Sequence, residues 1–89
     1  MEKRIGSALI LVEDSNEVSR LNEILSRHAH IIISRQGIPM REKKINLISL
    51  VLEGSTDEIG ALTGQVGRLK NIRIKSLLIP FIEKKNEKD

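Results

Sequence analysis

The sequence contains no cysteine, tryptophan or tyrosine, and its single phenylalanine is Phe81. Without cysteine the chain can form neither a disulfide nor a catalytic or metal-binding thiolate. Its core must therefore be built from Ile, Leu and Val. No apolar run approaches the ~20 residues of a membrane-spanning helix, and the residues after Met1 lack the apolar region of a signal peptide. We expect a cytoplasmic protein that does not contact a membrane.

Sequence signatures of enzymes are missing as well. The chain has no G-x-x-x-x-G-K-[ST] phosphate loop, no H-E-x-x-H zinc motif and no cysteine nucleophile. Ser15 and Ser55 are better explained as helix caps than as nucleophiles, because no histidine accompanies either in an activating motif. A sheet that binds RNA normally displays aromatic side chains, which this chain lacks. We therefore expect a protein that is not an enzyme, has no evident cofactor and does not bind nucleic acid directly.

The net charge of +3 is concentrated in one short stretch. Residues 35–44 hold four cations against one carboxylate, namely Arg35, Arg41, Lys43 and Lys44 against Glu42. A basic hairpin of this kind attracts phosphates or acidic groups. A solvated turn explains the same residues, because charged side chains are common at surfaces. Both interpretations stay open.

One pattern occurs twice, about forty residues apart. Residues 12–33 and residues 52–74 each resemble a strand end, a helix cap, an amphipathic helix and the next strand. Asp14 with Glu17, and Ser55 with Glu58, have the spacing of capping boxes. The apolar residues between them recur at helical spacing: Val18, Leu21, Ile24, Leu25 and His28 in the first copy, and Ile59, Leu62, Val66 and Leu69 in the second.

The apolar runs predict four strands around these helices. They cover residues 3–12, a second strand from Ile31 that is interrupted at residues 36–39, residues 45–52, and residues 72–79 up to Pro80. The order β-α-β-β-α-β is the ferredoxin-like α+β arrangement, a four-stranded antiparallel sheet with two helices on one face. We expect one domain over residues 1–80 and a charged, frayed tail over residues 81–89.

The predicted sheet is apolar on both faces, although two helices can cover only one of them. The strand at residues 45–52, for example, carries Leu47 and Val51 on one side and Ile48 and Leu50 on the other. An uncovered apolar sheet face usually marks an interface. We therefore predict a homo-oligomer, a dimer or a tetramer, that buries this face or joins sheets at their edges.

Two sets of residues are candidates for contacts with an effector. Arg35, Gly37 and Pro39 lie where the two repeats differ most, and they are interpreted either as an effector or partner contact or as a bulged hairpin. Gly60 and Gly64 lie in the second predicted helix, where each costs about 0.5–1 kcal/mol relative to alanine. Close approach of another backbone, or of a ligand, is the usual compensation.

His28 and His30 are the only histidines, and they offer an alternative site. A spacing of two places both on one side of an extended segment, as in a transition-metal site. A third ligand would have to come from a carboxylate or from another subunit. The competing interpretation is a histidine at a helix C-terminus, where it interacts with the helix dipole, followed by an ordinary strand residue.

Three segments, residues 30–39, 45–52 and 56–64, together resemble a bacterial family over about residues 3–79. It is the family of iron-only hydrogenase system regulators, with an ACT-like fold related to the C-terminal domain of the nickel-responsive regulator. The resemblance implies an oligomeric regulatory module that senses a small molecule or a metal and is linked to hydrogen metabolism. The sequence has no evident DNA-reading element, so we expect any control of transcription to act through a partner protein. The chain departs from these relatives in two places: it lacks the Asp-x-Pro-Gly-like turn of amino-acid-binding ACT domains, and residues 31–52 contain no histidine or cysteine for a nickel site.

Overall fold

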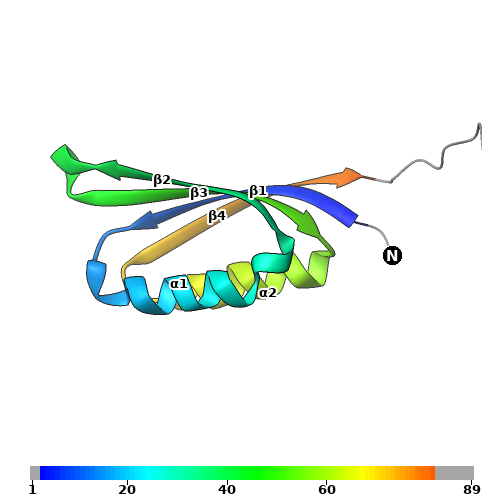
Figure 1. Ribbon diagram of the computed structural model, residues 1–89, viewed down its shortest axis with the longest axis horizontal. Helices are drawn as coiled ribbons and strands as arrows, with labels where there is room; N and C mark the ends of the chain where they lie inside the picture. The colour runs from blue at the N-terminus through cyan, green and yellow to red at the C-terminus, as the bar shows by residue number, and fades with distance from the viewer. Residues whose placement is uncertain (1–2, 82–89) are drawn as a thin grey trace, which may run out of the picture.

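A computed structural model describes residues 3–81 of the chain as a sheet covered by two helices on one face (Figure 1). The elements in chain order are β1 (Lys3–Val12), the 3-10 turn η1 (Ser15–Glu17), α1 (Val18–Arg27), η2 (Ala29–Ile31), β2 (Ile32–Met40), η3 (Arg41–Lys43), β3 (Ile45–Gly54), α2 (Thr56–Gly67) and β4 (Ile72–Phe81). The strands are antiparallel in the order β2-β3-β1-β4. This arrangement confirms the predicted ferredoxin-like fold. Residues 82–89 of the predicted tail lie outside the described residues.

The core lies between the sheet and the two helices. Alternate residues of β1 point into it, so that Ala8, Ile10 and Val12 are buried while Ser7 and Leu9 are exposed. The helices contribute the stripes predicted from the sequence. The buried helical residues are Leu21, Ile24 and Leu25 of α1 and Ile59, Leu62 and Val66 of α2. Aliphatic side chains thus fill the core, as the composition predicts.

The two helices begin differently. Ser55 caps α2 in a complete capping box, in which its hydroxyl accepts from the Glu58 N–H at 3.1 Å and the Glu58 carboxylate accepts from the Ser55 N–H at 2.8 Å. The box predicted for Asp14 and Glu17 is wrong. Asp14 caps the η1 turn through Asn16, and Glu17 pairs with Arg20 at 3.6 Å instead. The extra 3-10 turn moves the start of α1 three residues along the chain.

Neither proline ends a strand, which corrects the sequence-based boundaries. β2 continues through Pro39 opposite Asn46, and β4 continues through Pro80 opposite Arg4. Both strands lie at the edges of the sheet, where one side of the backbone has no ladder partner among residues 3–81. Proline is tolerated at an edge because its missing N–H is not needed there.

The second strand begins one residue later than predicted. Ile31 closes η2, which also contains His30, and β2 starts at Ile32. A register shift between Ile32 and Ser34 marks a bulge. After this bulge Arg35, Gly37 and Pro39 share the side of the sheet that faces the helices, because Arg35 is paired with the buried Leu50.

The sheet surface turned away from the helices, here called the open face, carries large apolar side chains. Those on its central rungs are exposed by 50% (Leu9), 38% (Val51), 69% (Leu77) and 60% (Ile79). The register brings them together, since Ser7 is paired with both Val51 and Leu77. The expected apolar face without a helical cover is therefore present. No helix within residues 3–81 has the length and apolar character that crossing a membrane requires.

Candidate functional site

The β2–β3 hairpin extends past the start of α1 and overhangs it (Figure 1). A groove of about 390 Å³ lies on the helix side of this overhang. We call it the hairpin groove. It is lined by Val12, Val18, Leu21, Asn22, Arg35, Gly37, Ile38, Pro39, Asn46, Leu47 and Ile48. Its size falls within the range of small-molecule pockets.

Among residues 3–81, Arg35 is the only charged residue that lines the hairpin groove. Its Nη2 donates to the Asn22 Oδ1 at 2.7 Å, which fixes the guanidinium against α1. Among residues 3–81 Arg35 forms no ion pair, so its charge meets only a neutral amide. A guanidinium has five N–H donors in a planar fork, and most of them therefore stay available to a ligand.

Gly37 and Pro39 of β2 both line the hairpin groove. A Cβ atom built at Gly37 would meet no atom within 4 Å, and its φ is not positive. Neither packing nor backbone conformation thus requires glycine at this position. By contrast, a Cβ at Gly6 would lie 2.8 Å from Leu78 Cδ2 and 3.2 Å from the Leu77 carbonyl oxygen. The three candidates Arg35, Gly37 and Pro39 are brought together in one groove.

Gly60 and Gly64 do not join them. Both glycines lie on the exposed side of α2, and neither lines the hairpin groove. A Cβ at either position would meet nothing within 4 Å. Packing against the rest of residues 3–81 therefore does not account for these glycines. Their assignment as contact residues stays a prediction.

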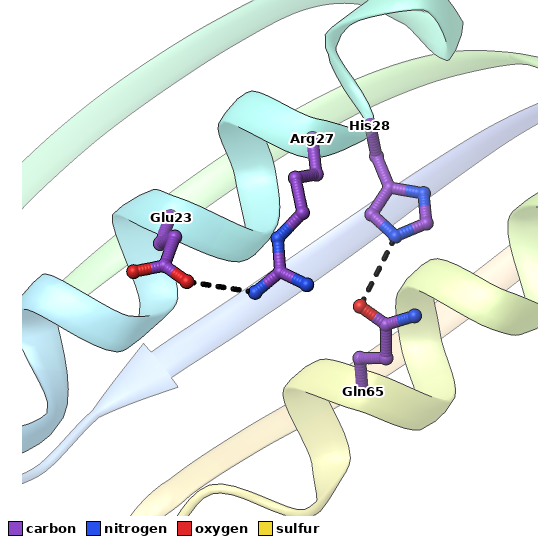
Figure 2. Close-up of polar contacts among 4 residues, drawn as sticks. All are labelled: Glu23, Arg27, His28 and Gln65. Carbon is purple, nitrogen blue, oxygen red and sulfur yellow. Dashed lines mark hydrogen bonds and ion pairs between the residues drawn. The ribbon is translucent and has the colours of Figure 1, made fainter.

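The histidines bridge α1 and α2 near the end of α1. His28 follows the last residue of α1, and its Nε2 lies 3.2 Å from Gln65 Oε1, as Figure 2 shows. His30 Nε2 lies 3.4 Å from Glu58 Oε2, and the two imidazole rings are stacked with centroids 6.4 Å apart. Within residues 3–81 no three His, Asp or Glu side chains are grouped so that they could hold a metal ion.

A second groove, about 420 Å³ in volume, runs between the outer surfaces of α1 and α2. Its lining includes Arg20, Arg27 and Arg68. Glu23 accepts from Arg27 at 2.9 Å one helical turn away (Figure 2), and Glu17 pairs with Arg20. Two of the three guanidinium charges are therefore compensated by carboxylates of the adjoining turns. Arg35 in the hairpin groove is not.

The electrostatics of the α2 cap are also defined. The Ser55 backbone N–H, by donating to the carboxylate, lowers the pKa of Glu58 below its ordinary value of 4.5. The Ser55 hydroxyl and the nearby His30 act in the same direction, and desolvation opposes them. Glu58 thus serves the cap as a carboxylate, and we assign it no chemical step.

The structure adds one residue to the site that the sequence did not indicate. Asn22 belongs to the polar side of α1, thirteen positions before Arg35. Only the packing of α1 under the hairpin brings them together. The cations of the hairpin tip, Arg41, Lys43 and Lys44, are exposed and line neither groove. They fit the solvated-turn interpretation of this basic stretch.

The fold and the groove define a small α+β domain of the ferredoxin-like class, with a ligand-sized groove. The family described as "Iron-only hydrogenase system regulator, putative" (TM1266-like) matches residues 4–76. The chain belongs to this family, as the resemblance predicted. The description is that of a regulator and not of an enzyme.

Solved structures agree with this assignment. The chain is similar to the uncharacterized protein TM1266 from Thermotoga maritima, with a TM-score of 0.82 and 38% identity over 88% of this chain and 99% of that one. It also resembles part of a formyltetrahydrofolate deformylase from Pseudomonas putida KT2440, with a TM-score of 0.50 and 10% identity over 83% of this chain and 28% of that one. This second likeness concerns the fold alone. No curated protein matches the chain.

Proposed function

We propose that this chain is a non-catalytic, ACT-like regulatory module that binds a small effector in the hairpin groove and works as an oligomer. The regulated system is the iron-only hydrogenase system of its family's description. The output passes to a partner protein and not directly to nucleic acid, in the cytoplasm. The hairpin groove is the receiving site in this proposal, and the open face is the assembly surface.

The observation that carries the proposal is the lack of a side chain at Gly37. A glycine in a strand interior weakens the strand and often marks the close approach of a ligand. Here the space above Gly37 is empty and belongs to the groove that also holds the uncompensated Arg35. A ligand in this space accounts for both residues.

The hydrogenase response in the organism of origin tests this function. We would replace the gene with a Gly37→Leu allele, whose side chain fills the groove, and with a Gly67→Ala allele as the matched control. Gly67 lines neither groove, and a Cβ there would meet only Ile74 Cγ2 at 3.8 Å. We expect the Leu allele to uncouple hydrogenase expression from the regulator as a deletion does, with the protein folded and present. The control should behave as wild type. A Gly37→Leu strain with a normal response would refute the proposal.

The oligomer in this proposal is formed by two copies that cover each other's open face. Four exposed apolar side chains lie on adjacent rungs, and the same face carries the carboxylate of Glu53 on β3, opposite Ile5, and the cation of Lys75 on β4, opposite Leu9. A two-fold axis places opposite charges of such a surface against each other. Leu77, the most exposed of the four, lies on the middle rung, opposite Ser7 and between the rungs of Ile79 and Leu9.

Sedimentation velocity tests the assembly independently of the ligand. The wild-type chain should sediment at micromolar concentration as a multiple of its 10.0 kDa mass. Leu77→Glu should shift it to the monomer, because a buried carboxylate would be unpaired. Arg41→Glu, at the exposed hairpin tip, is the matched control and should change nothing. A monomeric wild type would contradict this part.

His28 and His30 are the basis of the alternative, a metal-binding sensor. The short distance between His30 Nε2 and Glu58 Oε2 favours it, and the remaining ligand would come from a second subunit. Calorimetric titration with nickel, zinc and cobalt distinguishes the alternatives. Saturable heat that His30→Ala abolishes would support the sensor, and its absence from folded protein would exclude it.

A further inference from the structure

We infer that the ligand of the hairpin groove is a small organic monoanion, a monocarboxylate with an apolar body of about four to eight carbons, whose carboxylate binds Arg35. This inference rests on the proposed function and names the ligand's chemical class. Three features of the groove lead to it: its single positive charge, the lack of a carboxylate in its lining, and its apolar walls.

The charge of the ligand follows from Arg35. The groove is lined by one guanidinium and no Asp or Glu side chain. Asn22 holds the Nη2 end at 2.7 Å without neutralising it. Guanidinium and carboxylate match in a bidentate pair with two parallel hydrogen bonds. One cation thus balances one negative charge, and the Asn22 amide beside Arg35 supplies a further donor. Asn46 lies nearer the hairpin tip, because it is paired with Pro39 whereas Arg35 is paired with Leu50.

The same lining excludes other classes of ligand. A cation would be repelled by Arg35. The ammonium group of an amino acid would find no carboxylate in the lining, and burying an unpaired charge is costly. A compact dianion such as phosphate would leave the apolar part of the groove in contact with water. The groove therefore favours an anion that has no ammonium group and carries a hydrocarbon chain.

The body of the ligand follows from the walls. Val12 and Leu21 lie almost wholly beneath the surface, so the apolar surface open to a ligand comes from the half-buried Val18 and Ile48 and from the exposed Pro39. Burial of each methylene against such a surface tightens binding by about fourfold. Affinity should therefore rise with chain length until the groove of about 390 Å³ is filled.

The test is a titration of the ¹⁵N-labelled full chain with hexanoate, followed by two-dimensional NMR at constant ionic strength. We expect saturable shifts at the amides of Gly37 and Asn22 and a Kd in the millimolar range, as is usual for a ligand of so few atoms. Butanoate, which is shorter by two methylenes, should bind about 15-fold more weakly. Hexanamide and norleucine, matched in length but neutral or zwitterionic, should also bind about tenfold more weakly.

Variants separate the two ends of the site. Arg35→Met retains the apolar stem and should lose the preference for hexanoate over hexanamide. Arg35→Lys should restore part of it, since a lysine forms an ion pair without the bidentate geometry. Gly37→Leu should abolish the shifts of all four probes. Gly67→Ala, at the exposed end of α2 and outside both grooves, should bind hexanoate as wild type does.

The outcomes distinguish this inference from the proposed function. Equal affinity for hexanoate and hexanamide, or no shift at the groove amides in folded protein, overturns the monocarboxylate assignment. The proposed function then still stands if the Gly37→Leu allele uncouples hydrogenase expression in the host. A Gly37→Leu allele that regulates normally overturns the proposed function, whatever the titration gives. Hexanoate binding that depends on Arg35 and is blocked by Gly37→Leu supports the assignment.

Discussion

Replacing Gly60 and Gly64 with alanine should stabilise the protein, although both positions are candidate contacts. Glycine in a helix interior is less favourable than alanine by about 0.8–1.0 kcal/mol. Because a Cβ at either position meets nothing within 4 Å, no packing strain offsets this gain. The double variant should therefore unfold with a free energy about 1.5–2 kcal/mol higher than wild type. For a domain of this size that corresponds to about 10 °C in Tm.

The opposite sign is expected at Gly54, which serves as the control. A Cβ there would lie 3.0 Å from Ile31 Cγ2 and 3.1 Å from Glu58 Oε1. The new methyl group of Gly54→Ala would be too close to Ile31 in the core and to Glu58 in the capping box. Overpacking of this kind lowers the free energy of unfolding by about 1–3 kcal/mol. Gly54→Ala should therefore destabilise the protein, whereas the alanine substitutions at Gly60 and Gly64 should stabilise it.

Urea denaturation followed by circular dichroism measures these differences, with the m-value checked for each variant. A double alanine variant that is no more stable than wild type would refute the reasoning, because some other group must then occupy the space beside α2. A variant that is more stable but fails to regulate hydrogenase expression would support a contact role for the two glycines.

Three further predictions concern the core and the α2 cap. Leu62→Ala should lower the free energy of unfolding by about 2–5 kcal/mol, since Leu62 is fully buried; a loss under 1 kcal/mol in urea titrations would contradict this core. Ser55→Ala should cost about 1 kcal/mol, because the N–H of Glu58 loses its acceptor; an unchanged urea midpoint would show that the box contributes nothing. The third prediction concerns pH. Folding lowers the pKa of Glu58 below 4.5. The ionised carboxylate therefore stabilises the folded protein fully above pH 4.5, and this stabilisation is lost as the pH falls through the lowered pKa of the folded state. The stability difference between wild type and Glu58→Gln should therefore shrink below about pH 4.5, and a difference that stays constant from pH 7 to pH 3 would contradict the shift.

Local patterns in the sequence predicted most of the fold. The features that they predicted wrongly, the ends of two strands, depend on pairing between residues far apart in the sequence. The capping box of α2 and the span of β1 depend on neighbouring residues and were predicted correctly. The ends of the second and fourth strands were not, because Pro39 and Pro80 interrupt a strand only if it has neighbours on both sides. That both strands lie at edges depends on the order of the whole sheet.

The candidate site, too, was predictable only where it depends on local sequence. Arg35, Gly37 and Pro39 lie two residues apart, so that a strand places them on one face, and the structure gathers them in the hairpin groove. Asn22 could not be predicted, because its contact with Arg35 depends on how α1 crosses beneath the hairpin. Gly60 and Gly64 were selected, like Gly37, as glycines within a regular element, yet they lie outside the groove.

Native mass spectrometry of protein purified gently from its own cells tests the central claim most directly. We expect an oligomer, at a multiple of the 10.0 kDa chain mass, that gains an additional small-molecule mass when millimolar hexanoate is added. Gly37→Leu should lose this additional mass and leave the oligomer intact, whereas Gly67→Ala should keep both. The same bound mass on Gly37→Leu, or a wild-type monomer without any, would contradict the account.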